Sequence, residues 1–179
     1  MLDNDIERVL VSEEEIKDIA KQMGKQLSKD YKGKYPLVIG LLKGCVPFMG
    51  MLVTEMDIHV ELAFMDVSSY HGGISSSGDV KISKDLDISV SGRDIIIAED
   101  IVDTGRTIKV ITELLMYRGA NSVKIATLLD KPEGRVVELK PEYVGKVIPK
   151  EFVVGFGLDF DEKYRNLPYV GVLKESVYK

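Results

Sequence analysis

Residues 95–107 read IIIAEDIVDTGRT, and this stretch decides the fold. Its three consecutive β-branched isoleucines are typical of a strand that is covered on both faces of a sheet. The apolar run stops at two adjacent carboxylates, Glu99 and Asp100. Neighbouring carboxylates repel each other and are costly to bury without a partner. We therefore expect them at a strand end, where ligand hydroxyls or a cation can meet them.

The turn that follows, at 103–107, contains an acid, two threonines and a glycine. Gly105 permits the dihedral angles of a tight turn and lets a ligand approach the backbone closely. A helix is expected to begin near Ile108, with its free amides and the positive end of its dipole directed at this turn. An ordinary strand-to-helix turn with an acidic N-cap and no ligand is the alternative. The doubled acids favour a ligand that carries both sugar hydroxyls and a phosphate.

The rest of the chain alternates strand and helix patterns. A capping box at Ser12 and Glu15 predicts the start of an amphipathic helix. The strand–helix–strand order over residues 37–129 predicts an α/β fold with a doubly wound, mostly parallel sheet, whose ligand lies outside the carboxyl ends of the strands. The expected strands are 37–42, 60–67, 95–99 and 123–129, the expected helices are 47–56 and 108–118, and shorter apolar pieces follow at 144–148, 152–154 and 170–173.

These patterns fit one domain over residues 1–179. We expect its core at roughly 37–129 and a small hood formed mainly by 130–179 together with the N-terminal segment. Residues 69–92 are rich in glycine, serine and charged side chains. Because a long segment of this kind inside a compact domain is often functional, we expect a flexible lid there.

The composition argues against several kinds of partner. The net charge is −5 and there is no basic run, which argues against nucleic acid. No apolar run approaches the roughly 20 residues of a membrane span. The N-terminus is acidic, unlike a signal peptide, and the single cysteine, Cys45, excludes an internal disulfide. We expect a cytoplasmic protein whose substrates are small molecules.

Cations and polar residues follow the other expected strands. Lys43 and Gly44 come directly after the first core strand, where a cation and a close backbone approach suit a diphosphate; an ordinary turn is the alternative. Ser69 and Tyr70 open either a lid or a plain surface loop. Lys131, after the fourth core strand, can donate to a carbonyl oxygen of a base, although a solvated lysine is the commoner outcome.

Aromatic and charged residues also occur near the C-terminus. Phe152 can stack on a flat heterocycle, Asp159 can hold a metal through water, and Arg165 can reach a diphosphate. Taken singly, Phe152 is more typical of a core position, and Arg165 is more typical of an ordinary surface position.

The stretch at 95–107 resembles the phosphoribosyl-diphosphate signature of the type I phosphoribosyltransferases. That signature has apolar residues, two acids, two apolar residues, an acid or hydroxyl residue, Thr, Gly, any residue and Thr. Ala98 is smaller than the Val or Ile usual at its position. With the other strand-end segments, the match covers residues 38–173 in the same order and at compatible spacings. Over this length the chain resembles the hypoxanthine-guanine phosphoribosyltransferase family in its compact bacterial form.

The resemblance implies roles for the residues of the first stretch. Glu99 and Asp100 would bind the ribose 2′- and 3′-hydroxyls, directly or through Mg²⁺. Asp103 would lie near N7 of a purine and act as the general base, with its protonated form as the acid in reverse, and this role suits a partly buried side chain. The residues whose amides and hydroxyls would cradle the 5′-phosphate are Thr104, Gly105, Arg106 and Thr107.

The resemblance also implies how the diphosphate and the metal would be held. Lys43, Gly44 and Arg165 would contact the diphosphate. The peptide in the Lys43 loop can be cis in this family. Asp159 would hold Mg²⁺ together with the two acids at the end of the central strand.

For the base, the resemblance implies a site that prefers a 6-oxopurine. Lys131 would donate to the 6-oxygen, and because a lysine has donors but no acceptor it disfavours the 6-amino group of adenine. Phe152 would stack on the base, and the backbone of Val153 would meet its edge. Ser69 and Tyr70 would close over the site.

The implied activity is purine salvage. The phosphoribosyl group would pass from 5-phosphoribosyl 1-diphosphate to N9 of hypoxanthine or guanine, giving IMP or GMP and diphosphate. One alternative is a non-catalytic regulator that senses purine or phosphoribosyl diphosphate, but residues 1–36 hold one acidic amphipathic helix and no helix-turn-helix pattern. Another is a phosphoribosyltransferase that prefers xanthine. Because the family's members are dimers or tetramers, a homodimer or homotetramer is expected.

Overall fold

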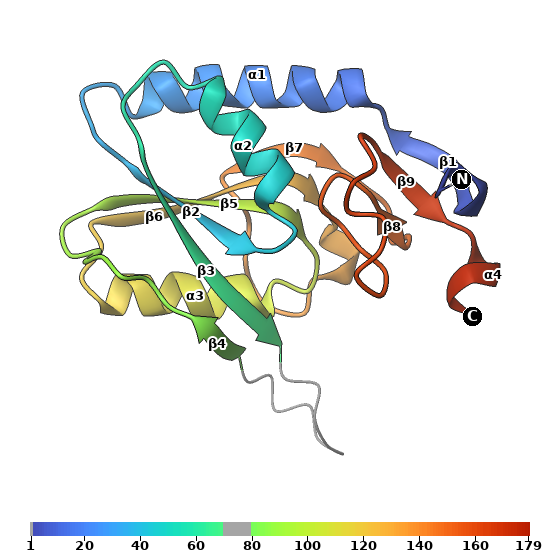
Figure 1. Cartoon of the computed structure of the whole chain (residues 1–179). Coiled ribbons are helices and arrows are strands. Elements are labelled where there is room, and N and C mark those ends of the chain that lie inside the picture. Colours follow the sequence, from blue (N-terminus) through green and yellow to red (C-terminus); the bar gives the residue numbers. More distant parts are fainter. Residues whose placement is uncertain (1, 70–79) are drawn as a thin grey trace.

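A six-stranded sheet forms the centre of the molecule, and the computed structural model describes the chain through residues 2–69 and 80–179 (Figure 1). The strands lie in the order β4-β3-β2-β5-β6-β7. Every neighbouring pair runs parallel except β3 and β4. The mostly parallel α/β sheet predicted from the sequence is therefore confirmed. The strands are β2 Leu37–Leu42, β3 Glu61–Ser69, β4 Val80–Lys84, β5 Asp94–Val102, β6 Ser122–Asp130 and β7 Tyr143–Val147.

Helices cover both faces of this sheet, as Figure 1 shows. Side chains of β5 alternate between the two faces. Ile96 packs in the cluster that includes α1 and α2, whereas Ile95 and Ile97 pack in the cluster that includes α3. Burial on both faces explains why this strand is a continuous apolar run. The helices are α1 Glu13–Asp30, α2 Val46–Thr54 and α3 Arg106–Tyr117.

Local signals in the sequence explain where α1 and α3 begin. The amide of Glu15 donates to Oγ of Ser12 at 3.1 Å, and the amide of Ser12 donates to Oε2 of Glu15 at 3.4 Å, which confirms the predicted capping box. α3 begins at Arg106 rather than near Ile108, directly after Gly105, whose φ is +78°. The glycine turn and the N-terminus of α3 are therefore contiguous.

A second sheet, with the strand order β1-β9-β8, forms a small hood. β9 pairs antiparallel with both β1 and β8, so the N-terminal segment and the C-terminal residues lie together (Figure 1). The strand at Ile6–Val11 is not predicted from the sequence, because Glu7 and Arg8 interrupt its apolar pattern. The remaining elements are β1 Ile6–Val11, β8 Val153–Val154, β9 Val170–Leu173, the 3-10 helices η1 Leu2–Asp5 and η2 Pro132–Gly134, and α4 Glu175–Tyr178.

One apolar piece expected in the hood belongs to the main sheet. The segment at 144–148 overlaps β7, which runs parallel to β6 and pairs Leu129 with Lys146. Assigning it to the hood is wrong because a half-exposed edge strand has the same short apolar pattern as a hood strand, and only its pairing with β6 distinguishes the two.

The predicted range of the lid, 69–92, extends too far toward the C-terminus. Residues 80–84 form β4, which is paired with β3. Val90 is 3% exposed and lies in the cluster that includes α3, with Leu86 and Ile88 packed against it. The apolar residues of this segment therefore serve packing rather than a mobile loop.

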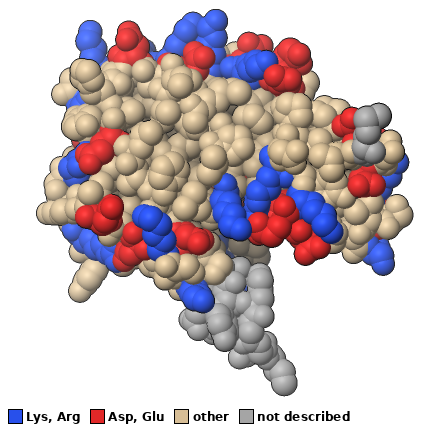
Figure 2. Space-filling model, in the orientation of Figure 1, with Lys and Arg blue, Asp and Glu red and all other residues tan. Residues whose placement is uncertain are grey.

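The surface carries both signs of charge. On the face drawn in Figure 2, lysine and arginine side chains are interspersed with aspartate and glutamate side chains rather than gathered into a basic stripe. Within residues 2–69 and 80–179, no helix combines the length and the apolar character that a membrane crossing requires.

Candidate active site

A cavity of about 670 Å³ lies where the carboxyl ends of β2 and β5 meet the hood. Its walls come from the end of β2, from the end of β5 with the following turn, and from a hood loop. The predicted site residues that line it are Lys43, Gly44, Glu99, Asp100, Asp103, Thr104, Gly105, Thr107, Asp159 and Arg165. Four further predicted site residues lie outside the lining: Arg106, Lys131, Phe152 and Val153.

Glu99 and Asp100 lie near the carboxyl end of β5, which continues to Val102 instead of ending at Glu99 as expected, because Ile101 and Val102 still pair with β6. Both acids are partly buried. Oε1 of Glu99 is buried and has no hydrogen-bond partner among the residues that the structure describes. Asp100 accepts the amide of Ile101 at 2.7 Å. Burial raises the pKa of Glu99 well above its usual range, and the charge of Asp100 raises it further. Burial also raises the pKa of Asp100, to about 6. Both carboxylates can accept donors from a ligand or bind a cation.

The loop after β2 lies against these acids. The Leu42–Lys43 peptide is cis. Gly44 approaches so closely that a Cβ atom there would sit 1.8 Å from Oδ2 of Asp100. A side chain at residue 44 would therefore displace the carboxylate, which explains why glycine stands at this position.

The turn after β5 presents the N-terminus of α3 to the cavity. Gly105 adopts a left-handed conformation, and helical residues begin immediately after it. Thr104 and Thr107 line the cavity, and Oγ1 of Thr104 accepts the amide of Arg106 at 3.4 Å. The free amides and the positive dipole end of a helix make such a position suitable for a phosphate. The side chain of Arg106 is exposed and does not contribute to the lining.

Asp103 and Lys131 meet as an ion pair. Nζ of Lys131 donates to Oδ2 of Asp103 at 3.1 Å. The lysine side chain is 11% exposed, and the aspartate side chain is 44% exposed. The lysine expected to read a base is therefore nearly buried and is held beside the acid expected to handle a proton.

The two hood residues expected to meet a base lie next to each other at the start of β8. Phe152 is 40% exposed, and its ring stacks on Tyr178 of the C-terminal helix with 4.8 Å between the ring centroids. Val153 is buried and pairs with Val172 in the hood sheet. For the lid, Ser69 is the last residue of β3, whereas Tyr70 lies outside the described residues.

A hood loop brings a second cation to the cavity. Nη1 of Arg165 donates to the carbonyl of Gly157 at 2.7 Å and lies 3.1 Å from Oδ1 of Asp159. Nη2 of Arg165 lies 3.2 Å from Oε1 of Glu162, whose Oε2 lies 2.9 Å from Nζ of Lys43. Lys43 and Arg165 together hold the pKa of Glu162 below its usual value.

The chain is similar to known proteins over nearly its whole length. The chain is 64% identical to the hypoxanthine-guanine phosphoribosyltransferase of Lactococcus lactis, over 99% of this chain and 96% of that protein. It is 62% identical to the protein of the same name from Streptococcus pyogenes, over 99% of each chain. Residues 9–161 match the phosphoribosyl transferase domain. The chain belongs to the hypoxanthine-guanine phosphoribosyltransferase family.

Solved structures of the family share the fold. A hypoxanthine phosphoribosyltransferase from Staphylococcus aureus superposes with a TM-score of 0.96 at 53% sequence identity, covering 99% of this chain and 97% of that one. The small hood and the extra strand β7 are thus part of a fold that this relative shares over nearly its full length.

Two charged residues of the site are not predicted from the sequence. Arg135 donates from Nε to the carbonyl of Asp103 at 2.9 Å and pairs through Nη2 with the carboxylate of Asp130. Glu162 bridges the two cations of the cavity. The only sequence signal for either is a charged residue shortly after a recognised segment, which is too common to single out a functional residue.

The donor set fits Mg²⁺. Mg²⁺ prefers oxygen ligands and usually binds one or two carboxylates together with waters and substrate oxygens. Oε1 of Glu99 lacks a partner within the described part of the chain, and Asp100 and Asp159 line the same cavity. Across residues 2–69 and 80–179, no group of three or more acidic, histidine or cysteine side chains is placed to hold a metal by itself. These residues therefore suit an ion that is shared with a substrate.

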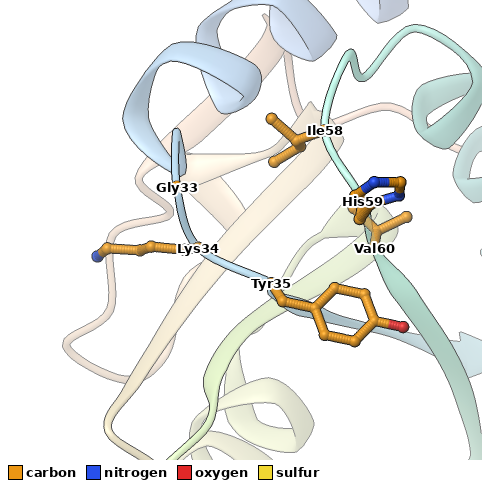
Figure 3. A pocket seen from close by; sticks show the side chains of 6 residues that line it. All are labelled: Gly33, Lys34, Tyr35, Ile58, His59 and Val60. Carbon is orange, nitrogen blue, oxygen red and sulfur yellow. The ribbon is translucent and has the colours of Figure 1, made fainter.

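A second cavity, of about 530 Å³, lies at the opposite end of the sheet, before the first residues of β2 and β3. Figure 3 shows its lining, in which the Lys34 side chain extends away from Tyr35, Ile58 and His59. The described lining contains no carboxylate, so it does not offer the acid and cation pairs of the larger cavity. Its lining residues are Gly33, Lys34, Tyr35, Ile58, His59 and Val60.

Proposed function

We propose that this chain carries out purine salvage by transferring the phosphoribosyl group of 5-phosphoribosyl 1-diphosphate to N9 of hypoxanthine or guanine, giving IMP or GMP and diphosphate. It is a pentosyltransferase. The observation that carries the proposal is the position of Glu99 and Asp100. Oε1 of Glu99 is buried without a partner among the described residues, and Asp100 lies beside it in a cavity that also contains the Gly105 turn, Lys43 and Arg165. A ligand with hydroxyls, a phosphate and a diphosphate matches all of these groups.

The sugar phosphate is bound by β5 and the turn that follows it. Glu99 and Asp100 accept the ribose hydroxyls, which supply the donors that the buried carboxylates need. The 5′-phosphate lies at the N-terminus of α3, where backbone amides and the helix dipole stabilise its charge. The residues of this phosphate site are Thr104, Gly105, Arg106 and Thr107, with Arg106 contributing through its backbone because its side chain lies outside the cavity lining.

The diphosphate is bound by Lys43, by the backbone at Gly44 and by Arg165. Members of this family are generally Mg²⁺-dependent. When bound, Mg²⁺ neutralises charge on the diphosphate and so assists its departure as a leaving group. Glu99, Asp100 and Asp159 would hold the ion. Lys43 and Arg165 stabilise the charge that grows on the diphosphate as its bond to the anomeric carbon breaks.

The base is handled by Asp103 and Lys131. N9 of the purine attacks the anomeric carbon while Asp103 accepts the proton at N7, and the same carboxyl returns it in the reverse reaction. Lys131 donates to the 6-oxygen, so a 6-oxopurine is preferred to adenine. The 3.1 Å contact between these side chains supports the assignment, because one base can meet both of them along its edge.

The hood completes the base site. Phe152, whose ring stacks on Tyr178 in the free protein, is assigned to stacking on the base, and the backbone of Val153 is assigned to the base edge. Ser69 and Tyr70 belong to the proposed lid, which excludes water that would otherwise hydrolyse the activated sugar. In this proposal the single domain consists of the main sheet as core and the smaller sheet as hood.

We propose that the chain assembles as a homodimer or homotetramer. α2 consists of nine residues without a charged side chain. Val46 on this helix is 50% exposed, and Leu62 on β3 is 47% exposed. Apolar side chains that are exposed in one subunit are candidates for burial against another. Light scattering coupled to size-exclusion chromatography measures the mass in solution, and a monomeric mass would contradict the proposal. A cytoplasmic location stays a prediction of the sequence.

Steady-state assays with four purines test the function. The purified chain is mixed with phosphoribosyl diphosphate and Mg²⁺, and hypoxanthine, guanine, xanthine and adenine are compared by release of diphosphate and formation of the nucleotide. Turnover with hypoxanthine and guanine, and little with adenine, is expected. A clear preference for xanthine would contradict the assignment of hypoxanthine and guanine as the substrates. Absence of diphosphate release with every base would favour a non-catalytic regulator that senses purine or phosphoribosyl diphosphate.

A further inference from the structure

One carboxylate joins the two cations assigned to the diphosphate. Lys43 follows β2 and Arg165 lies in the hood, yet both pair with Glu162. Each carboxylate oxygen meets a different cation, since Oε2 lies 2.9 Å from Nζ of Lys43 and Oε1 lies 3.2 Å from Nη2 of Arg165. All three side chains line the same cavity. Glu162 thus uses the donors that a bound diphosphate needs.

The loop that carries Glu162 is built around these contacts. Its amide donates to Oδ2 of Asp159 at 2.9 Å. Asp161 and Glu162 have φ values of +53° and +61°, a conformation that residues with side chains rarely adopt. Arg165 is fixed from behind by the carbonyl of Gly157. The arrangement is therefore a constrained loop and not a chance pairing of two long surface side chains.

The arginine retains capacity for a further acceptor. Its Nε is buried and has no hydrogen-bond partner among the described residues. A buried donor without a partner is unfavourable, and a ligand oxygen would correct this. Lys43 and Glu162 are 62% and 64% exposed, so their pair is weak and can be exchanged readily.

We propose that Glu162 is an internal substitute for the diphosphate, which the substrate displaces on binding and which recaptures both cations when the product leaves. The inference rests on the proposed function of the cavity. Carboxylate and phosphate oxygens are acceptors of the same kind for lysine and arginine, and the same donors cannot serve both fully. No covalent bond changes; one set of charge-assisted hydrogen bonds replaces another.

This exchange affects both ends of the reaction. In the free protein, Glu162 keeps Lys43 and Arg165 near each other and lowers their net attraction for anions. After transfer, its return to the cations speeds the departure of diphosphate. Glu162 therefore acts as a residue that sets diphosphate affinity, and it lowers the affinity in favour of release.

The test uses Glu162→Gln in the full chain, with inorganic diphosphate and Mg²⁺ as the probe. Calorimetric titration is expected to show a dissociation constant lower by about three- to tenfold, the size expected from losing competition by exposed ion pairs. The KM for phosphoribosyl diphosphate is expected to fall, and kcat to stay level or fall if release becomes limiting. Glu162→Asn, whose side chain tolerates a left-handed backbone, is expected to act in the same direction.

Asp161→Asn is the matched control. It removes one negative charge from the neighbouring residue of the same loop, where Asp161 pairs with Lys163 and touches neither cation of the cavity. Its diphosphate affinity is expected to match that of the unsubstituted chain. If both variants tighten binding equally, general electrostatics explains the gain and the inference is overturned.

The remaining outcomes separate this inference from the proposed function. Weaker diphosphate binding by Glu162→Gln would mean that the carboxylate positions the cations, and unchanged binding would mean that it does not compete; either result overturns the inference alone. If the unsubstituted chain binds no diphosphate with Mg²⁺ present, the proposed function fails and the inference fails with it.

Discussion

β5 and β6 lie side by side in the sheet, and each has acidic residues at or near its carboxyl end, but the charges of these acids are compensated differently. At β5, Oε1 of Glu99 has no partner within the described chain and the pKa of Asp100 is raised to about 6. At β6, Asp130 pairs with Arg135. Among the described residues, Glu99 and Asp100 form no salt bridge and are assigned to a ligand, whereas Asp130 is paired with Arg135, which also contacts the turn that carries Asp103.

Arg135 shows what the compensated end does. Its guanidinium donates to the carbonyls of Asp103 and Leu139 as well as to Asp130. The arginine and Asp130 side chains are 12% and 11% exposed. The turn that carries Asp103 is thus tied to the segment that carries Lys131. Because the two strands differ in this way, substitutions of Arg135 and of Asp100 are expected to change the free energy of unfolding in opposite directions.

The largest expected effect is the loss of catalysis when Asp103 is replaced. Arg135 ties the turn that carries Asp103 to the end of β6. Asp103→Asn should lower kcat by about 10²- to 10⁴-fold, because an amide cannot accept the proton at N7. Folding and diphosphate binding should be retained, since the turn backbone is held by Arg135. Steady-state kinetics and calorimetry measure both, and an unchanged rate would reject the proton-transfer role.

The next effect concerns stability at β6. Arg135→Met leaves Asp130 buried without its partner, and breaking such a pair typically costs about 3–5 kcal/mol. Urea denaturation of Arg135→Met and of the unsubstituted chain measures the difference in the free energy of unfolding. Lys17→Met breaks an exposed pair with Glu13 on the surface of α1 and serves as the control. Exposed pairs contribute roughly 0–1 kcal/mol, so equal losses in both variants would remove the distinction between the two strand ends.

Replacing Asp100 on β5 should change stability in the opposite direction. Asp100→Asn should stabilise the unliganded protein at neutral pH by about 1–3 kcal/mol, since it removes a charge whose burial is unfavourable. The same variant should lose activity, because the ribose site and the metal site share this carboxylate. A fall in the thermal midpoint would show that Asp100 is already compensated in the free protein.

The pH dependence of stability follows from the same pKa. A carboxyl whose pKa is raised on folding binds more protons in the folded state than in the unfolded one, so its contribution to stability falls as pH rises between those two values. For Asp100 this window extends from about its usual pKa near 4 to about 6. Asp100→Asn should flatten the decline, and identical pH profiles for the two proteins would contradict the assignment.

The smallest expected effect is on the choice of base. Lys131→Gln replaces a donor with a group that both donates and accepts, so adenine should be used about tenfold better relative to hypoxanthine. The ratio of kcat/KM for the two bases measures this. Full retention of discrimination would remove Lys131 as the residue that reads the 6-position.

Much of the fold is predictable from local patterns. The apolar run before Glu99, the capping box at Ser12 and Glu15 and the glycine at 105 each specify a short segment through its own residues, and the structure places them as expected. The strand at Ile6–Val11 and the membership of β7 depend on pairing with distant partners. Neither follows from the local pattern.

The candidate site divides in the same way. Residues within one segment, from Glu99 to Thr107, can be identified together because their spacing is a local property. Glu162 and Arg135 act through side-chain contacts across the fold. Glu162 reaches Lys43 across 119 positions of the chain, and such an ion pair leaves no periodic signal in the sequence.

A crystal structure of the chain with IMP tests the central claim most directly. The account predicts the ribose hydroxyls at the carboxylates of Glu99 and Asp100, with the phosphate at the N-terminus of α3 around Gly105. IMP bound at another place, with Oε1 of Glu99 still lacking a donor, would contradict it.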